Sequence, residues 1–124
     1  MEMPKPDEDV LARRQEIATA LREIVPGEGV IVDEDALRPY ESDGLTAYKT
    51  LPLIVVLPDT KNQVSQVMRY CHENAIKVVP RGAGTSLSGG ALPLADGIIL
   101  GLGKFKKILE IDYDNRCAVV QPGV

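Results

Sequence analysis

The chain has 124 residues, 44% of them hydrophobic, and a formal net charge of −4 at pH 7. This length suits one small domain, and the hydrophobic fraction is high enough for a packed core, which argues against a disordered chain. The acidic balance and the lack of a dense Lys/Arg stripe disfavour nucleic acid as the main partner, and one Phe, four Tyr and no Trp leave little for base stacking. No apolar run approaches the roughly 20 residues of a membrane-spanning helix.

The first predicted element is a helix over residues 7–25, in which apolar residues recur along one side at helical spacing. Asp7 can cap its first turn, and the acidic residues that follow suit the positive end of the helix dipole. A Pro-Gly pair stops this helix. Residues 29–32 form a short extended piece, and Asp33 caps a short second helix. Asp43 and Gly44 are predicted to form a turn. Residues 45–50 are weakly patterned, and we interpret them as an ordered loop.

A βαβ unit is predicted in the middle of the chain. Residues 53–57 are a continuous apolar run, typical of a parallel strand that is covered on both faces. Thr60 and Gln63 make a capping box at the start of an amphipathic helix. The predicted apolar stripe of this helix consists of Val64, Val67, Met68 and Cys71. Residues 78–79 are the core of the next strand, and residues 97–102 form a third. The expected fold class is therefore α+β, with a small, three-stranded, mainly parallel sheet packed with helices.

The last predicted element is a β-hairpin. Residues 108–112 and 117–121 are its two strands, and residues 113–116 are the turn between them. No further strand follows in this sequence to cover the edges of the hairpin. Because an uncovered edge pairs readily with another chain, we expect self-association through it.

The stretch most informative about function is the glycine-rich run 80–91, which directly follows the strand at 78–79. Glycines cluster where the backbone needs a positive φ or must approach another group closely. Successive N–H groups in such a run can converge on an anion, and a phosphate or pyrophosphate is the obvious occupant. The loop also leaves the carboxyl end of a parallel strand, where ligands of open α/β sheets bind. The alternative is a flexible surface loop.

Two common phosphate motifs do not fit this run. A Rossmann fingerprint needs a glycine where Leu87 stands. A Walker A loop needs a lysine and a hydroxyl residue where Gly90 and Ala91 stand. Without that lysine and hydroxyl, the terminal phosphates and Mg²⁺ have no ligands, so nucleoside triphosphate hydrolysis is disfavoured. What remains is a loop suited to a diphosphate held by backbone amides.

Residues 81–90 resemble the pyrophosphate loop of FAD-linked oxidases of the vanillyl-alcohol oxidase type. Flanking segments are similar to the group that contains the D subunit of glycolate oxidase and D-lactate dehydrogenases, namely residues 40–48, 53–58, 91–97 and 108–124. The resemblance implies an FAD-binding domain whose first subdomain is residues 1–107. It also implies that the hairpin at 108–124 begins the second subdomain, so that the chain would be an N-terminal fragment.

The resemblance further implies a set of residues that bind FAD: Pro80, Arg81, Gly82, Ala83, Gly84, Thr85, Ser86, Gly89 and Gly90. Backbone N–H groups of residues 82–86 would be the main ligands, with hydroxyl donors added by Thr85 and Ser86. Attachment is expected to be noncovalent, because relatives that bind FAD covalently through this loop have a histidine where this chain has Thr85. Arg81 has two alternative roles, pairing either with the diphosphate or with a carboxylate that shapes the loop.

Several other residues keep two interpretations. By resemblance Tyr48 lies near the flavin, but it could equally cover a sheet edge. Residues 122–124 either line the FAD site or only end a strand. His72 is interpreted as a solvent-facing helix residue. Together with Cys71 and Cys117 it cannot supply a structural zinc site, so no metal is expected.

The reaction implied by the resemblance is the FAD-dependent oxidation of a small 2-hydroxy acid to a 2-oxo acid. No catalytic residue can be assigned on this chain. Four hydrogen bonds from backbone N–H groups to charged diphosphate oxygens would contribute about 6–12 kcal/mol to the binding free energy. Association itself costs on the order of 4–15 kcal/mol. We therefore expect the chain alone to be inactive and to bind FAD weakly or not at all. The alternative function is a non-catalytic α/β binding or interaction module.

The sequence also bears on location and partners. Two cysteines and no signal segment fit a reducing cytoplasm. The resemblance implies that other oxidase subunits are partners, and that through them the protein would lie at the inner face of the membrane.

Overall fold

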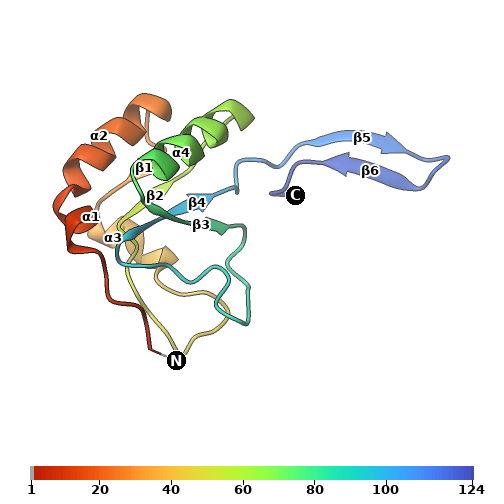
Figure 1. Ribbon diagram of the computed structural model, residues 1–124. Coiled ribbons are helices and arrows are strands. Elements are labelled where there is room, and N and C mark those ends of the chain that lie inside the picture. The colour runs from red at the N-terminus through yellow and green to blue at the C-terminus, as the bar shows by residue number, and fades with distance from the viewer. Residues whose placement is uncertain (1) are drawn as a thin grey trace.

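The computed structural model describes residues 2–124, and its centre is a four-stranded sheet (Figure 1). In spatial order the strands are β1 (Val30–Ile31), β2 (Ile54–Val56), β4 (Gly97–Gly101) and β3 (Lys77–Arg81). β4 runs parallel to both of its neighbours, and β1 pairs with β2 in the antiparallel direction. The mainly parallel sheet is confirmed. The extended piece at residues 29–32 adds a short edge strand to the three strands expected.

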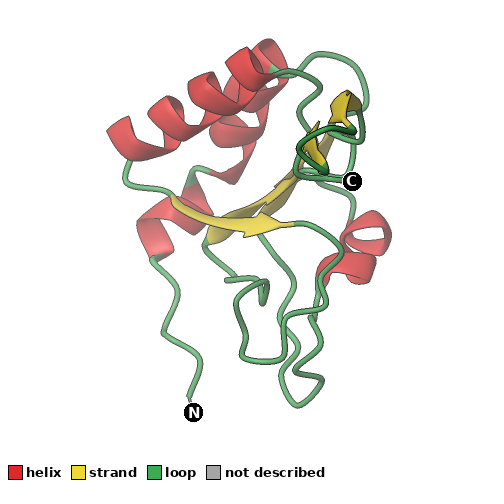
Figure 2. Ribbon diagram, turned by 90° about the vertical axis from the view of Figure 1, so that its right-hand side faces the viewer, coloured by secondary structure: helices red, strands yellow, loops and turns green. Residues whose placement is uncertain are grey.

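Helices cover both faces of this sheet (Figure 2). The helical elements are α1 (Glu8–Ala12), α2 (Arg14–Ile24), α3 (Glu34–Leu37), a 3-10 turn at Arg38–Tyr40 and α4 (Lys61–Glu73). α2 and α4 pack on one face, and α3 with the 3-10 turn packs on the other. The βαβ connection through α4 passes over β4, because β4 lies between β2 and β3.

The helix expected over residues 7–25 is interrupted at Arg13. Asp7 caps α1 as predicted, and its carboxylate accepts the N–H groups of Asp9 and Val10. The Arg13 guanidinium donates to the carbonyl of Asn74 at the end of α4. The next residue, Arg14, donates to the carbonyls of Leu53 and Val32 at 3.2 and 2.6 Å. No proline or glycine signals this break, so periodicity alone could not place it.

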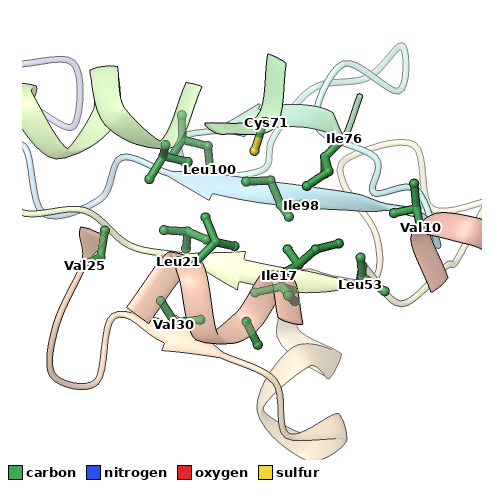
Figure 3. Packing of buried hydrophobic residues seen from close by; sticks show 14 residues of the cluster. Val10, Ile17, Leu21, Val25, Val30, Leu53, Cys71, Ile76, Ile98 and Leu100 are labelled. Atoms are coloured by element: carbon green, nitrogen blue, oxygen red, sulfur yellow. The ribbon is translucent and has the colours of Figure 1, made fainter. Parts of the chain in front are cut away.

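The apolar runs at residues 53–57 and 97–102 contain the buried strands β2 and β4, as predicted. Successive strand side chains point to opposite faces. Figure 3 shows Ile98 and Leu100 of β4 among the side chains of α2 and α4. The alternate residues Val55 and Ile99 meet Leu37 of α3 on the other face. Met68 differs from expectation, because it lies on the predicted apolar stripe of α4 but is 45% exposed.

The hairpin forms a separate antiparallel sheet of β5 (Ile108–Asp112) and β6 (Cys117–Val120), which extends away from the rest of the molecule (Figure 1). Its base is held by the N–H of Gln121, which donates to the carbonyl of Lys107. Several of its apolar side chains are between 44% and 61% exposed: Ile108, Leu109, Ile111, Val119 and Val120. The division into subdomains at residue 107 stays a prediction.

Candidate cofactor site

The glycine-rich loop leaves β3 at Arg81 and ends at Ala91, and residues 92–96 connect it to the start of β4. It runs beside the loop that precedes β2, and both hang from the sheet toward the bottom of Figures 1 and 2. Within residues 2–124, none of the backbone N–H groups of residues 82–89 donates to a protein acceptor. The N–H groups of the next two residues are engaged, that of Gly90 by the hydroxyl oxygen of Ser86 at 3.0 Å and that of Ala91 by the Asp43 carboxylate. Eight successive donors are therefore free to meet an anion.

The course of the loop requires glycine at one position in particular. Gly84 has a φ of +72°, which side chains with a Cβ rarely adopt. A Cβ on Gly84 would also overlap the guanidinium group of Arg81. Gly89 turns the chain a second time with a φ of +80°.

Arg81 holds the shape of the loop in this structure. One of its terminal nitrogens donates to the carbonyl oxygens of Ser42, at 2.8 Å, and Ala91, at 3.2 Å. The guanidinium also lies over the ring of Tyr40, 5.6 Å from its centroid. Of its two alternative roles, this is the loop-shaping one, with carbonyl oxygens in place of the expected carboxylate. A contact between Arg81 and a diphosphate stays a prediction.

Asp43 is a buried residue of this site that the sequence did not reveal. Only 6% of it is exposed. Its carboxylate accepts the N–H of Leu45 at 2.9 Å and, across the molecule, that of Ala91 at 3.2 Å. Sequence reasoning predicted only a turn at Asp43 and Gly44. The nearest available signal was its place inside the segment 40–48, which carries the family resemblance.

The other residues singled out in the sequence lie in a strand, in the loop itself or on the surface. Pro80 belongs to β3, an edge strand, where its missing N–H is tolerated. The Ser86 hydroxyl oxygen is used within the loop, as described above, and the Thr85 side chain is exposed. Tyr48 is half-buried and His72 is exposed on α4, as predicted for the histidine.

The end of the chain comes close to the start of the loop. Gly82 and Ala83 share a cavity of about 270 Å³ with Gly103 and residues 122–124. The N–H of Gly123 donates to the carbonyl of Phe105 at 2.7 Å, which fixes this segment beside the loop. The volume lies just below the roughly 300–1,000 Å³ of pockets for drug-sized ligands, so it suits part of a dinucleotide.

Three further observations bear on other functions. A larger cavity of about 590 Å³ lies between the start of α4 and the base of the hairpin, and the glycine-rich loop contributes nothing to its lining. Residues 2–124 hold no group of three side chains suited to a metal ion. No helix in this described part is long and apolar enough to cross a membrane.

The fold and the site together define a class of protein. A mainly parallel sheet with helices on both faces carries, at a strand's carboxyl end, a glycine-rich loop with free amides, which is an α/β cofactor-binding arrangement. A family described as the FAD binding domain matches residues 52–124. The chain therefore belongs to the FAD-binding domain family, and FAD is its cofactor.

Three similar proteins, two matched by sequence and one by structure, show which members of this family the chain resembles. The glycolate oxidase subunit GlcD of Escherichia coli strain K12 is 50% identical over 111 residues, which cover 90% of this chain and 22% of that protein. The mitochondrial D-2-hydroxyglutarate dehydrogenase of Arabidopsis thaliana is 32% identical, over 82% of this chain and 18% of its own length. The structure of 4-ethylphenol oxidase from Gulosibacter chungangensis matches with a TM-score of 0.80 and 25% identity, over 99% of this chain and 24% of that one. The chain thus spans about a fifth of these relatives, and its resemblance to FAD-linked oxidases is confirmed.

Proposed function

We propose that this chain is the FAD-binding portion of a flavin-dependent oxidoreductase that acts on a glycolate- or D-lactate-like 2-hydroxy acid. The observation that carries this proposal is the run of free N–H groups at residues 82–89 in a chain of the FAD-binding family. The names of the relatives from Escherichia coli and Arabidopsis thaliana support the substrate class. The chemistry supplied by the flavin is two-electron oxidation of the hydroxyl-bearing carbon, which leaves a 2-oxo acid.

The role of this chain's own residues is to bind and orient. The amides of residues 82–86 hold the diphosphate, and those of residues 87–89 also have no protein acceptor in the described chain. Residues 122–124 close one side of the site. No residue of this chain is assigned to the chemical step.

The flavin is proposed to be held noncovalently, since the loop offers Thr85 and no histidine. The test uses the full-length natural protein. Its visible spectrum should show a flavin band, and acid precipitation should leave the flavin in the supernatant. Turnover with a panel of 2-hydroxy acids and an artificial electron acceptor should then give the 2-oxo acids. A flavin that precipitates with the protein would contradict noncovalent binding, and a colourless protein would favour the non-catalytic binding module.

A cytoplasmic location and an assembly with other oxidase subunits are part of the proposal, with attachment at the inner face of the membrane through those subunits. The Escherichia coli relative is named as a subunit, which supports an assembly. Tagged natural protein should co-purify with partner chains, and high salt should release it from membranes. A protein that purifies alone from the soluble fraction would contradict the assembly.

A further inference from the structure

The two ends of the glycine-rich loop are held together at a single residue, Ala91. Arg81 opens the loop and Ala91 closes it, and the carbonyl of Ala91 accepts from the Arg81 guanidinium at 3.2 Å. The N–H of the same Ala91 donates to the Asp43 carboxylate at 3.2 Å. Ala91 is 7% exposed and Asp43 is 6% exposed. Because water has little access to either residue, the Ala91 N–H and the Asp43 carboxylate satisfy each other's hydrogen bonding.

The segment that carries Asp43, residues 40–44, also contacts the glycine-rich loop and Arg81. The ring of Tyr40 and the carbonyl of Ser42 hold the Arg81 guanidinium, against which Gly84 packs. A Cβ on Gly44 would come within 2.9 and 2.7 Å of the loop's carbonyl oxygens at residues 85 and 86. The loop's carbonyl side thus rests on this segment, while the N–H groups of residues 82–89 have no protein acceptor within the described chain.

We propose that Asp43 is a positioning residue that, together with Arg81, holds the glycine-rich loop in its anion-binding form before any cofactor is present. The proposal rests on the proposed function and extends it to a residue that does not touch the ligand. Charged partners make the stronger hydrogen bonds, and a preformed cradle spares the ligand the entropy of ordering a loop. Asparagine has one neutral oxygen in place of two charged ones. Asp43→Asn therefore leaves no charge-assisted bond to Leu45 or Ala91 and leaves one of these two N–H groups without an acceptor, which lets the loop spread.

The test compares Asp43→Asn with Glu41→Gln. Glu41 lies two residues away and forms long ion pairs with Arg38 and Lys49, at 3.9 and 3.7 Å, so its variant removes the same charge without reaching the loop. Without cofactor, hydrogen exchange at the Ala91 amide should be about tenfold or more faster in D43N than in the wild type, since a charge-assisted bond is lost. In E41Q the exchange rate of this amide should not change. In the full-length natural protein, stripped of flavin, the Kd for FAD should also rise about tenfold or more.

A core variant, Val67→Ala, separates positioning from general stability. Val67 is fully buried in α4, on the face of the sheet opposite α3 and Tyr40, so this variant destabilises the fold without touching the loop. We expect V67A to lower the melting temperature and to leave the Kd for FAD unchanged. Equal Ala91 exchange in D43N and the wild type would overturn the fastening. Faster exchange with an unchanged Kd would overturn the positioning role while the proposed function stands. A wild-type protein that binds no FAD would instead contradict the proposed function, and the exchange arm would still decide the fastening.

Discussion

Gly82 and Gly84 of the glycine-rich loop differ in how closely other atoms surround them. Gly84 has a positive φ and packs against Arg81, whereas nothing lies within 4 Å of the place where a Cβ on Gly82 would stand. The loop therefore needs glycine at residue 84 for its backbone course. At residue 82 the missing side chain leaves room that a bound ligand can use.

This contrast predicts different stabilities for two alanine variants. Gly84→Ala should lower the free energy of unfolding by about 1–2 kcal/mol or more, because the left-handed conformation and the overlap with Arg81 both oppose it. Gly82→Ala should change it by less than about 0.5 kcal/mol. Urea denaturation of the three proteins measures both values. Similar losses in the two variants would contradict the described course of the loop.

A second buried acid, Asp96, ties the chain's start to the sheet. Its side chain is 3% exposed, and it accepts hydrogen bonds from the Lys77 ammonium at 2.6 Å and from the Asp7 N–H at 2.8 Å. Burial by itself raises the pKa of Asp96, but the hydrogen bonds and charge of Lys77 and the Asp7 amide outweigh it and hold the pKa below its usual value. The ionised form is thus favoured in the folded protein.

A lowered carboxyl pKa stabilises the fold above the unfolded-state pKa of about 3.9 and ceases to do so as the pH falls through the folded-state pKa. Asp96→Asn should therefore lower the free energy of unfolding by about 1.5–3 kcal/mol at pH 7. The difference from the wild type should shrink as the pH drops below about 4. Urea denaturation between pH 3 and pH 7 measures this trend.

The control for Asp96 is Asp59→Asn, which breaks an ion pair with Lys104 of 3.0 Å in which both side chains are about half exposed. Pairs of this kind contribute less than about 1 kcal/mol. A loss in D96N no greater than in D59N, or one independent of pH, would show that Asp96 is not held as described.

At the scale of elements, α4 begins with a complete capping box. The Thr60 hydroxyl accepts the N–H of Gln63, and the Gln63 side chain accepts that of Thr60. Both bonds satisfy donors that the first turn of a helix otherwise leaves free. The pattern was legible in the sequence because it spans only four residues.

Thr60→Ala should destabilise the protein by about 1 kcal/mol, because it removes the cap. Thr19→Ala is the matched control, since Thr19 is exposed inside α2 and its hydroxyl only donates back to Gln15. That change should lie within about 0.5 kcal/mol of zero. Thermal and urea denaturation compare the two, and an equal effect in both would argue against a role for the cap.

The hairpin of β5 and β6 is an element with no third strand in the described chain. We propose that it mediates self-association through its exposed edge and apolar side chains. Ile111→Lys, which places a charge on β5, should weaken that association. Gln66→Lys adds the same charge on exposed α4 and should not. Light scattering over a range of concentrations tests this, and a wild-type chain that stays monomeric at high concentration would contradict it.

At the scale of the whole molecule, the loop and the C-terminal segment form only part of a dinucleotide site. Their shared cavity of about 270 Å³ is small for FAD. We therefore predict that these 124 residues alone bind FAD weakly or not at all, whereas the full-length natural protein binds it tightly. Isothermal titration calorimetry on both measures the difference. A submicromolar Kd for the 124-residue chain would overturn this prediction.

Local patterns explain how far prediction from sequence could go. The apolar runs, the capping box and the glycine-rich loop after β3 each depend on neighbours within a few residues, and the structure confirms all three. The position of β4 between β2 and β3 and the break at Arg13 were not predictable, because they depend on packing between distant segments.

By itself the sequence determined most of the helices and strands, the family resemblance and the loop whose amides are free, since periodicity, capping and glycine content are local properties. Only the tertiary structure decided how that loop is held. Asp43 and Ala91 are 48 residues apart, and no sequence pattern brings them together. They meet because the paths of two loops from the same sheet converge, which buries a carboxylate where an N–H would otherwise lack a partner.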